Sequence, residues 1–386
     1  MRTICVFTGT RAEYGLLRPL LRRIDAAQAL HLQLLVSGTH LSPAHGMTIR
    51  EIEGDGFHIH QRVPMLGEGD EPPDICRAMA RGLEGLSGAL DRMAPDLVVI
   101  LGDRYEAFCA ATAATMLSIP IAHIHGGEAT YGAVDEVLRH AITKMAHLHF
   151  TSTEAYRQRV IQLGEHPDRV FRVGALGIET IRALVPATRD AIAKDIGFPL
   201  DQPFVLVTLH PETRRRGTAG ELANALLQAL DEVKGPRVLF TRANADPEGH
   251  EINRRLEAYT AQRGERCALH ASLGIERYLG AMRYAQAVVG NSSSGLLEAP
   301  AMGVPSVDIG GRQAGRVRPR SVVHCTPGSG DIADAIRRAI EPAFRAGIED
   351  QDNPYEADFL PSQAIAEVLW TTPLDGLLAK RFHDLP

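Results

Sequence analysis

The sequence predicts an α/β protein made of two Rossmann-like, doubly wound domains. Short runs rich in β-branched residues alternate with helical segments, which is typical of parallel strands joined by crossover helices. This alternation stops after residue 174 and restarts at residue 204. The length of 386 residues exceeds one ordinary core, and the 45% of hydrophobic residues is enough for two.

The first half contains a complete set of candidate strands and helices. The strands are expected at residues 3–8, 32–37, 97–101, 119–125, 147–151 and 170–173. The helices that fit between them are expected at residues 14–27, 75–93, 104–117, 133–146 and 154–163. Together these elements make one doubly wound unit.

A helical passage punctuated by prolines, at about residues 175–200, is expected to link the two halves. The domains are therefore expected at residues 1–180 and 181–363. The strands of the second half are expected at residues 204–209, 238–241, 268–270, 287–290, 304–309 and 322–325.

Composition excludes several classes of protein. The net charge of -6 is spread over interleaved acids and bases, which argues against a nucleic-acid partner. No run approaches the ~18 apolar residues of a membrane span, so no membrane partner is expected. The five cysteines show no CxxC spacing, which favours buried, reduced thiols. Because the N-terminus has no signal-peptide pattern, a cytoplasmic protein is expected.

Polar motifs follow the expected strands repeatedly. Parallel α/β sheets bind ligands beyond the carboxyl ends of their strands, and two facing sheets place the site in the cleft between them. The functional residues are therefore expected in these motifs. In chain order they are TGTRAEYG, SGTHLSPAHG, GDRYE, HIHGGE, TLHPETRRR and GNSSSGLLEAP.

GNSSSGLLEAP has the composition of an anion-binding turn. Ser292, Ser293, Ser294 and Gly295 precede or open a helix that is expected to start near Ser294. Exposed backbone N–H groups and the positive end of a helix dipole would bind a diphosphate there. A serine that only caps a helix gives the same pattern, so this alternative stays open.

Neighbouring residues add to the case for a phosphate ester. Glu298 lies about one turn further on and is suited to a ribose diol. GGRQAGRVRPR supplies four arginines, of which Arg312 or Arg316 is expected to meet the phosphates. Arg11 in TGTRAEYG is expected to reach the same phosphates across the cleft. GTR lacks the GxGxxG spacing, which disfavours a nicotinamide enzyme.

Titratable groups gather in the first half. Asp103 follows a strand and either faces the cleft or caps the next helix. Asp135 and Arg139 are spaced for one helix face, where a plain surface pair is worth only ~0.3 kcal/mol. His123 and His125 alternate on a strand, so one is expected to enter the packing and the other to face the cleft.

His210 in TLHPE follows the first strand of the second half. It is either a structural histidine or a group that faces the phosphate or the reacting sugar. No HxxE or HExxH spacing is present and the histidines are dispersed, so no protein-bound metal is expected.

Taken together, these motifs resemble the hydrolysing UDP-N-acetylglucosamine 2-epimerases of bacterial sialic-acid biosynthesis. The ordered match runs from about residue 3 to about residue 325 and also includes DEVLRHAITKMAHLHF and GRQAGRVR. Similar enzymes act on UDP-N,N'-diacetylbacillosamine in legionaminic-acid synthesis and share the motifs. The resemblance implies a GT-B-type fold, a UDP-sugar between the domains, a C-terminal helix at about 364–386 that packs on the first domain, and a homo-oligomer (dimer or tetramer).

The resemblance also implies the reaction. UDP is eliminated across C1 and C2 to give a 2-acetamidoglucal, and water then adds to release N-acetylmannosamine, with no cofactor. Asp103, Glu128 and Asp135 form the acid/base set, Arg139 orients it and His210 lies near the diphosphate. Some relatives read HIEGGE where this chain has HIHGGE, so either His125 or Glu128 makes the second proton transfer.

Three other functions remain as alternatives. A GT-B glycosyltransferase would share the UDP site but leave C2 of the sugar untouched. A non-hydrolysing epimerase would return UDP-N-acetylmannosamine in place of the free sugar. A non-catalytic UDP-sugar sensor would need the phosphate-binding turn but no proton carriers.

Overall fold

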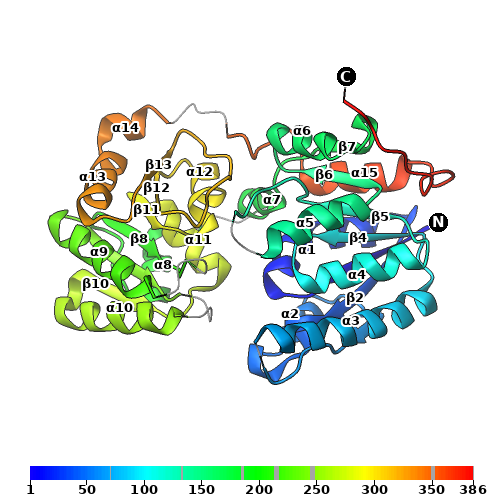
Figure 1. Cartoon of the computed structure of the whole chain (residues 1–386). Coiled ribbons are helices and arrows are strands. Elements are labelled where there is room, and N and C mark those ends of the chain that lie inside the picture. Colours follow the sequence, from blue (N-terminus) through cyan, green and yellow to red (C-terminus); the bar gives the residue numbers. More distant parts are fainter. Residues whose placement is uncertain are drawn as a thin grey trace. The chain divides into compact units, whose positions relative to one another are not determined.

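The computed structural model describes residues 1–69, 71–131, 134–183, 187–212, 217–243, 248–348 and 353–385, which fold into two compact units (Figure 1). Unit 1 comprises Met1–Glu128, Val134–Thr180 and Tyr355–Pro386, and unit 2 comprises Ala129–Ala133 and Ile181–Pro354. Each unit contains one all-parallel sheet with helices on both faces. The predicted fold class of two Rossmann-like, doubly wound domains is therefore confirmed.

The sheet of unit 1 has seven strands in the order β3-β2-β1-β4-β5-β6-β7. Consecutive strands run outward in opposite directions from β1 and β4, so the topological switch point lies between these two strands. Buried aliphatic residues fill them because both faces of the sheet are covered. The strands are β1 Arg2–Thr8, β2 Leu30–Ser37, β3 Gln61–Val63, β4 Leu97–Leu101, β5 Ile121–Ile124, β6 Leu148–Thr151 and β7 Val170–Arg172.

Helices cover the two faces of this sheet with separate cores. One core joins the strands to α1 and α15, and the other joins them to α3 and α4. The capping box of α1, in which Thr10 accepts from the Glu13 N–H, fixes where the β1 strand turns into that helix. The helices are α1 Arg11–Ala26, α2 Ile49–Gly54, α3 Pro72–Met93, α4 Tyr105–Met116, α5 Val134–Met145, α6 Glu154–Gln162, α7 Leu176–Ala183 and α15 Pro361–Thr371.

The C-terminal segment differs from the expected helix at 364–386. The helix α15 ends at Thr371, where Pro373 prevents its continuation, and the described residues beyond it are irregular. α15 packs on α1 through Ile365 and Leu369. Lys380 then donates to the backbone carbonyls of residues 144 and 146, both at 2.7 Å, which ties the irregular segment to unit 1.

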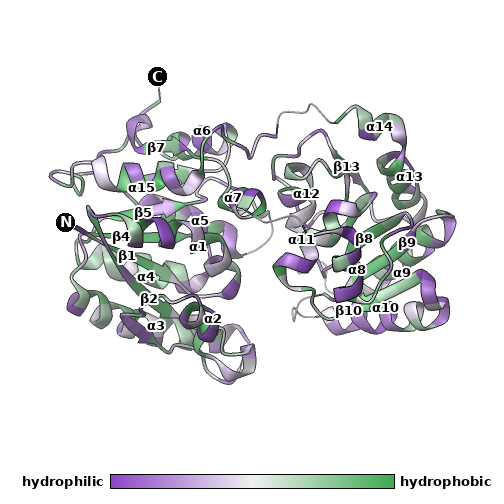
Figure 2. Ribbon diagram, turned by 180° about the vertical axis from the view of Figure 1, so that it is seen from behind, coloured by the Kyte–Doolittle hydropathy of each residue, from purple (hydrophilic) through white to green (hydrophobic). Residues whose placement is uncertain are grey.

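The sheet of unit 2 has six strands in the order β10-β9-β8-β11-β12-β13, with its switch point between β8 and β11. Most strands of the two sheets are hydrophobic, with the edge strand β3 as an exception, whereas hydrophilic and hydrophobic residues alternate along the helices (Figure 2). The strands are β8 Phe204–Thr208, β9 Arg237–Thr241, β10 Cys267–His270, β11 Ala287–Gly290, β12 Ser306–Ile309 and β13 Val322–Cys325. The helices are α8 Arg189–Ile196, α9 Ala219–Glu232, α10 Gly249–Arg263, α11 Gly274–Tyr284, α12 Glu298–Ala301, α13 Ser329–Ile340 and α14 Pro342–Ala346.

The helices, the cysteines and the candidate metal ligands each bear on a prediction made from composition. None of the helices in the described ranges is long and apolar enough to cross a bilayer. Four of the five cysteines are buried, but Cys76 on α3 is exposed because it lies on the outer side of that helix, so the prediction of a buried thiol is wrong there. Over the same ranges, no three His, Cys, Asp or Glu side chains lie together as ligands for a metal ion.

Candidate functional site at the strand ends of the two units

Asp103 lies directly after β4 and forms an ion pair with Arg139 of α5. Arg139, whose side chain is only 2% exposed, donates from Nη2 to Oδ2 of Asp103 and from Nη1 to Glu136 Oε2 at 2.9 Å. The N-cap of α4 is Arg104, so the alternative that Asp103 caps that helix is wrong. The ion pair with a buried guanidinium fixes the position of the Asp103 carboxylate at the end of β4.

Asp135 lies at the start of α5, on the same side of the unit as Asp103. Burial, followed by the negative charge of Asp103, raises the pKa of Asp135 above its ordinary value. The sequence paired Asp135 with Arg139, but the ion pairs that Arg139 forms in the described part of the chain run to Asp103 and Glu136. Glu136 was not among the candidate residues, although its spacing of three from Arg139 is the signal that could have identified it.

The two histidines of HIHGGE have different environments. His123 is fully buried in β5, and its Nε2 donates to the carbonyl of Gly102 at 2.7 Å while Nδ1 lies 3.1 Å from Thr143 Oγ1. Burial lowers the pKa of His123 to about 3, so this imidazole is neutral and structural. His125 follows β5 with its side chain 12% exposed. The HIHGGE motif therefore contains one histidine that is packed in the core and one that is partly accessible.

The backbone of HIHGGE is held in an unusual conformation at His125. His125 has a φ of +65°, in the left-handed region that a side chain with a Cβ rarely adopts. Its N–H donates to the carbonyl of Phe150 at 2.8 Å, and Arg159 of α6 donates to the carbonyl of Gly127 at 2.5 Å. Gly127 has a φ of +76°, and a Cβ there would lie 2.5 Å from the carbonyl oxygen of Tyr156. The neighbouring strand and helix therefore impose the turn that carries His125.

Glu128 is buried between His125 and a serine that follows β6. Ser152, which is fully buried, donates to Oε1 of Glu128 at 2.8 Å. Nδ1 of His125 lies 3.6 Å from the same oxygen. The hydroxyl fixes the direction of the carboxylate, and the carboxylate faces the imidazole. Ser152 was not predicted, because only its position after a strand in FTST marks it.

In unit 2, Asn291 joins the ends of β8 and β11. Its Oδ1 accepts from the His210 N–H and its Nδ2 donates to the His210 carbonyl, both at 2.8 Å. The Asn291 carbonyl accepts from Arg312 at 3.0 Å and from Gln313 at 2.8 Å. Burial, and then the charge of Arg312, lowers the pKa of His210 to about 4. His210 and Arg312 are thus brought together by an asparagine that the sequence candidates omitted.

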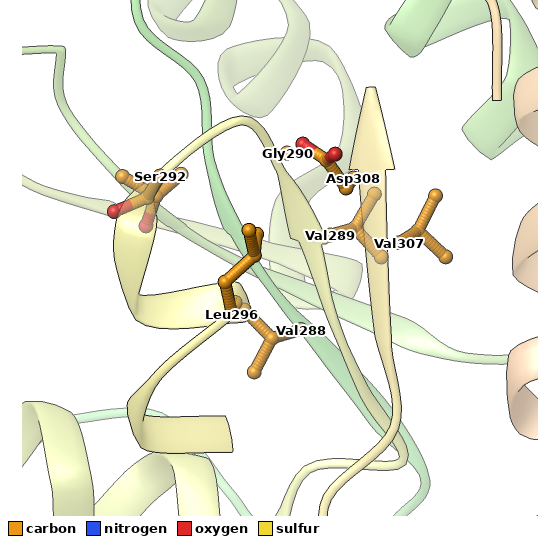
Figure 3. Close-up of a pocket in the computed structure, with 9 residues that line it drawn as sticks. Val288, Val289, Gly290, Ser292, Leu296, Val307 and Asp308 are labelled. Carbon is orange, nitrogen blue, oxygen red and sulfur yellow. The ribbon is translucent and has the colours of Figure 1, made fainter. Parts of the chain in front are cut away.

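The serine turn, residues 292–295, follows β11 and contains no long helix. Ser293–Gly295 forms a single 3₁₀ turn, and α12 has only four residues, so the prediction of a helix starting near Ser294 is wrong (Figure 3). The physical reason is that Pro300 lacks the N–H needed to continue a helix through this segment. Any anion held here would meet hydroxyls and backbone N–H groups without the dipole of a regular helix.

Hydrogen bonds connect several side chains around the serine turn. Ser294 donates to Ser292 from its Oγ at 3.1 Å, and Ser306 of β12 donates to the Gly295 carbonyl. A small pocket behind the turn is lined by residues of β8, β11 and β12 (Figure 3). These lining residues are Thr208, Val288, Val289, Gly290, Ser292, Gly295, Leu296, Val307 and Asp308.

The remaining candidate residues are divided between the units. Glu298 has a raised pKa because it is buried, with the charge of Arg316 opposing the shift, and its Oε2 has no hydrogen-bond partner among the described residues. Arg318 binds Asp308 at 2.9 Å and is structural. Arg11, which is exposed on α1, forms an ion pair with Glu51 of its own unit at 2.9 Å, so its approach to a phosphate stays a prediction. Residues 213–216 of TLHPETRRR lie outside the described residues.

Unit 1 carries titratable groups at the ends of its strands, and unit 2 carries fixed hydrogen-bond donors at the ends of its strands. This combination is typical of a two-domain, Rossmann-like enzyme. A family model described as UDP-N-acetylglucosamine 2-epimerase matches residues 22–369. The chain therefore belongs to the UDP-N-acetylglucosamine 2-epimerase family, and it is an epimerase.

Individual relatives match over the whole chain. The chain is 37% identical over 384 residues, 100% of this chain and 99% of the relative, to the GDP/UDP-N,N'-diacetylbacillosamine 2-epimerase (hydrolyzing) of Campylobacter jejuni. It is also 37% identical, over 100% of this chain and 98% of the relative, to the polysialic acid biosynthesis protein P7 of Escherichia coli. A crystal structure of UDP-GlcNAc 2-epimerase from Neisseria meningitidis bound to UDP-GlcNAc has the same fold, with a TM-score of 0.80 at 18% identity over 96% of this chain and 100% of that chain.

Proposed function

We propose that this protein is a hydrolysing 2-epimerase that converts UDP-N-acetylglucosamine to N-acetylmannosamine and UDP. The observation that supports this best is the arrangement after β4 and β5, where Asp103 contacts Arg139 and His125 faces Glu128. Inversion at C2 needs one group to remove a proton and another to return one to the opposite face of the sugar. Two separately held acid/base groups in one unit meet that requirement.

The first half of the proposed reaction is an elimination. Asp103, held in place by Arg139, takes the proton from C2 as the C1–O bond to UDP breaks. The electron pair of the C2–H bond forms the C1–C2 double bond of 2-acetamidoglucal, and the diphosphate leaves with the electrons of the C1–O bond. Ser292 and the backbone of the serine turn bind the diphosphate before and after the bond breaks, and Arg11 and Arg312 stabilise the negative charge that the departing UDP gains.

The second half is a hydration. His125, as imidazolium, gives its proton to C2, while water adds to C1 and loses a proton to Asp135. In this proposal Glu128, whose Oε1 accepts from Ser152, orients the imidazole. The raised pKa of Asp135 makes it a stronger base than an ordinary aspartate. Exchange with solvent then restores the starting protonation of the three groups.

Unit 2 supplies the UDP-binding part of the proposal. His210, whose pKa of about 4 keeps it neutral at neutral pH, donates a hydrogen bond to the diphosphate without changing charge. Arg312 and Arg316 contribute positive charge, and Glu298 binds the ribose hydroxyls with its unpaired Oε2. The proposal also includes a cytoplasmic location and a homo-oligomer (dimer or tetramer), and light scattering tests the oligomeric state.

A second substrate, UDP-N,N'-diacetylbacillosamine, is favoured by one specific observation. The Campylobacter jejuni relative carries that substrate in its name, and the Escherichia coli relative carries polysialic acid in its name, at the same 37% identity. The two sugars share the C1 and C2 groups on which the chemistry acts. UDP-N-acetylglucosamine would serve sialic-acid synthesis, and UDP-N,N'-diacetylbacillosamine would serve legionaminic-acid synthesis.

The test is to incubate the enzyme with each UDP-sugar in D₂O and to follow the products by NMR. Release of UDP and of a free 2-epimerised sugar with deuterium at C2 is the expected result, and the faster substrate identifies the pathway. Retention of hydrogen at C2 in a transferred sugar would indicate a glycosyltransferase, and a nucleotide-linked product would indicate a non-hydrolysing epimerase. Binding of UDP without turnover of either UDP-sugar would indicate a non-catalytic UDP-sugar sensor.

A further inference from the structure

A chain of side-chain hydroxyls runs beneath the serine turn of unit 2. Thr241 at the end of β9 lies 2.6 Å from Thr208 at the end of β8, and Thr208 lies 3.5 Å from the hydroxyl of Tyr278 on α11. The Tyr278 hydroxyl lies 2.8 Å from Ser294 Oγ, which donates to Ser292 Oγ at 3.1 Å. These five residues form the hydroxyl chain.

The hydroxyl chain has a direction. Because Ser294 uses its only proton toward Ser292, Tyr278 is the donor to Ser294. Tyr278 then accepts from Thr208, and Thr208 accepts from Thr241. Burial raises the pKa of Tyr278, so the phenol keeps the proton that it donates. Donors aligned in one direction polarise one another, which strengthens each bond.

The hydroxyl chain ends at Ser292, whose own hydroxyl proton is not used within the chain. Ser292 Oγ accepts from the Ser294 hydroxyl and lies 3.4 Å from the Ser294 N–H, so its lone pairs face inward. Its own O–H is therefore available for an acceptor outside the turn. A hydroxyl that accepts hydrogen bonds from within the turn and donates its proton outward is suited to bind a negatively charged oxygen.

The serine turn is also supported by the bond from Ser306 to the Gly295 carbonyl and by the bonds between Asn291 and His210. The preceding Gly290 has a φ of +142°, and a Cβ there would lie 1.9 Å from the Thr208 carbonyl, so β11 ends against β8 without a side chain. The 3₁₀ turn has three residues and α12 has four, so no regular helix holds the turn in place. The Tyr278 hydroxyl is the contact that connects the turn to α11 and, through Thr208 and Thr241, to two strands.

We propose that Tyr278 is a positioning residue for the diphosphate of the UDP-sugar, acting through Ser294 to aim the Ser292 hydroxyl outward. This rests on the proposed function, because it takes the serine turn as the UDP-binding element. UDP is present in the substrate and in the departing product, so the bonds that Tyr278 supports are made in both. Their loss therefore raises KM and leaves kcat nearly unchanged.

The experiment compares Tyr278→Phe with the matched control Tyr284→Phe. Tyr284 lies at the last position of the same helix, and its hydroxyl donates to the Ala187 carbonyl at 3.0 Å, away from the serine turn. Tyr278→Phe is expected to raise KM for the UDP-sugar and the Kd of UDP about 5- to 10-fold, with kcat within about twofold of the wild type, as expected for the loss of one or two hydrogen bonds. Tyr284→Phe is expected to match the wild type in all three quantities.

A double variant separates positioning from a general effect on folding. In a Ser294→Ala background, Tyr278→Phe is expected to change the Kd of UDP by less than about twofold, because the bond that it removes is already lost. Full additivity of the two substitutions, or a Tyr278→Phe enzyme with wild-type Kd and KM, would overturn the proposal. Wild-type protein that neither binds UDP nor turns over a UDP-sugar would instead refute the proposed function.

Discussion

The two units share one architecture but carry different chemistry at the ends of their strands. In unit 1 the residues after β4 and β5 form contacts between acids and bases, as in Asp103 with Arg139 and Glu128 beside His125. In unit 2 the residues after β8 and β11 are held by amide and hydroxyl hydrogen bonds, as in Asn291 with His210 and Ser294 with Ser292. The same edge of the same kind of sheet thus presents two kinds of groups.

This difference matches two tasks that need different side chains. Proton transfer requires groups that change charge near neutral pH, and carboxylates and imidazoles do so. Binding a diphosphate through a whole reaction requires donors that keep one protonation state, which hydroxyls, amides and backbone N–H groups do. We infer that unit 1 performs the proton transfers and unit 2 holds the nucleotide, and each prediction below challenges that division.

The largest expected effect is on turnover, from a single change in unit 1. Asp103→Asn keeps the size of the side chain and can still contact Arg139, but it cannot take a proton from C2. We expect kcat to fall by about 1,000-fold or more, as for loss of a proton-transfer group in the transition state. Steady-state release of UDP measures this.

Asp55→Asn is the matched control for that change. Asp55 also lies in unit 1 and contacts arginines, with Arg22 at 3.4 Å and Arg18 at 3.6 Å. It follows α2 as the C-cap of that helix and lies away from Asp103, so the kcat of Asp55→Asn is expected to stay within about twofold of the wild type. Equal losses in the two variants would mean that Asp103 acts only through the charge balance of the unit.

The next effect is on the stability of unit 2 alone. Gly290→Ala places a Cβ 1.9 Å from the Thr208 carbonyl at a positive φ, and we expect a loss of about 3 kcal/mol or more. Gly197→Ala is the control, because its φ of +63° is also positive but lies in the milder αL region, and a Cβ there would meet nothing within 4 Å. It is expected to cost only about 1–2 kcal/mol.

The single tryptophan makes this measurement specific for one unit. Trp370 lies on α15 of unit 1, so its fluorescence anisotropy reports unfolding there, whereas far-UV circular dichroism reports both units. In Gly290→Ala, part of the dichroism transition is expected to move to lower urea while the Trp370 transition stays in place. Movement of both transitions together would show that the units unfold as one.

A smaller effect concerns acid stability. Burial lowers the pKa of His40 to about 4, of His123 to about 3 and of His147 to about 4 in unit 1, and that of His210 to about 4 in unit 2. As the pH falls below about 6.5, the unfolded chain binds protons that these native histidines do not, so the native state loses stability until about pH 4. Glu13, with a pKa raised to about 8, opposes this in unit 1 between about pH 8 and 4.5, because its native form binds a proton first.

The pKa values of His60 and His149 in unit 1 and of His270 in unit 2 are also lowered, while those of Asp135 in unit 1 and Glu298 in unit 2 are raised and oppose the loss. Unit 1 has the larger excess of such histidines, so it is expected to be the more acid-sensitive half. Urea unfolding at about pH 7 and about pH 5, followed by Trp370 and by dichroism, is expected to show a loss in unit 1 that exceeds that in unit 2 by about 1 kcal/mol or more. A larger loss in the dichroism component that Trp370 does not report would contradict this.

The smallest expected effect is on the kcat of Ser152→Ala, a variant that forms a matched pair with Tyr278→Phe. Ser152→Ala removes the hydrogen bond to Glu128 Oε1 and so loosens the orientation of His125. Because that group acts in the transition state, we expect kcat to fall about fivefold with KM unchanged, the reverse of the change expected for the tyrosine. Thr112→Ala, which loses a 2.8 Å bond to the Phe108 carbonyl within α4, is the control. A rise in KM alone for Ser152→Ala would place it in UDP binding.

Sequence patterns predicted the fold well because the strands are long apolar runs that are buried on both faces. The run from Ile119 to His125, for example, contains β5. The strand β3 was missed because Gln61–Val63 is a three-residue edge strand with polar residues and no apolar run. The helix expected at Ser294 failed because a single proline outweighed the capping signal of the serines.

The candidate site could be predicted only where its residues are close in sequence or follow a strand. Asp103 and His125 were found in that way. The partner of Arg139 was not, because Asp103 lies 36 positions away and reaches it only through the pairing of β4 with β5. Ser152 and Asn291 follow strands, but nothing local distinguishes them from other residues after strands. Tyr278 lies within α11 and carries no local signal, since it acts through a contact with a distant segment.

The division of labour between the units is tested most directly by isothermal titration of UDP into three forms of the protein. Asp103→Asn is expected to bind UDP with the wild-type Kd, because the nucleotide meets unit 2. Ser292→Ala combined with Ser294→Ala is expected to raise the Kd about 10-fold or more, since a charge-assisted hydrogen bond and its support are lost. An Asp103→Asn protein that loses UDP affinity as severely as the serine variant, or a serine variant with the wild-type Kd, would contradict the division.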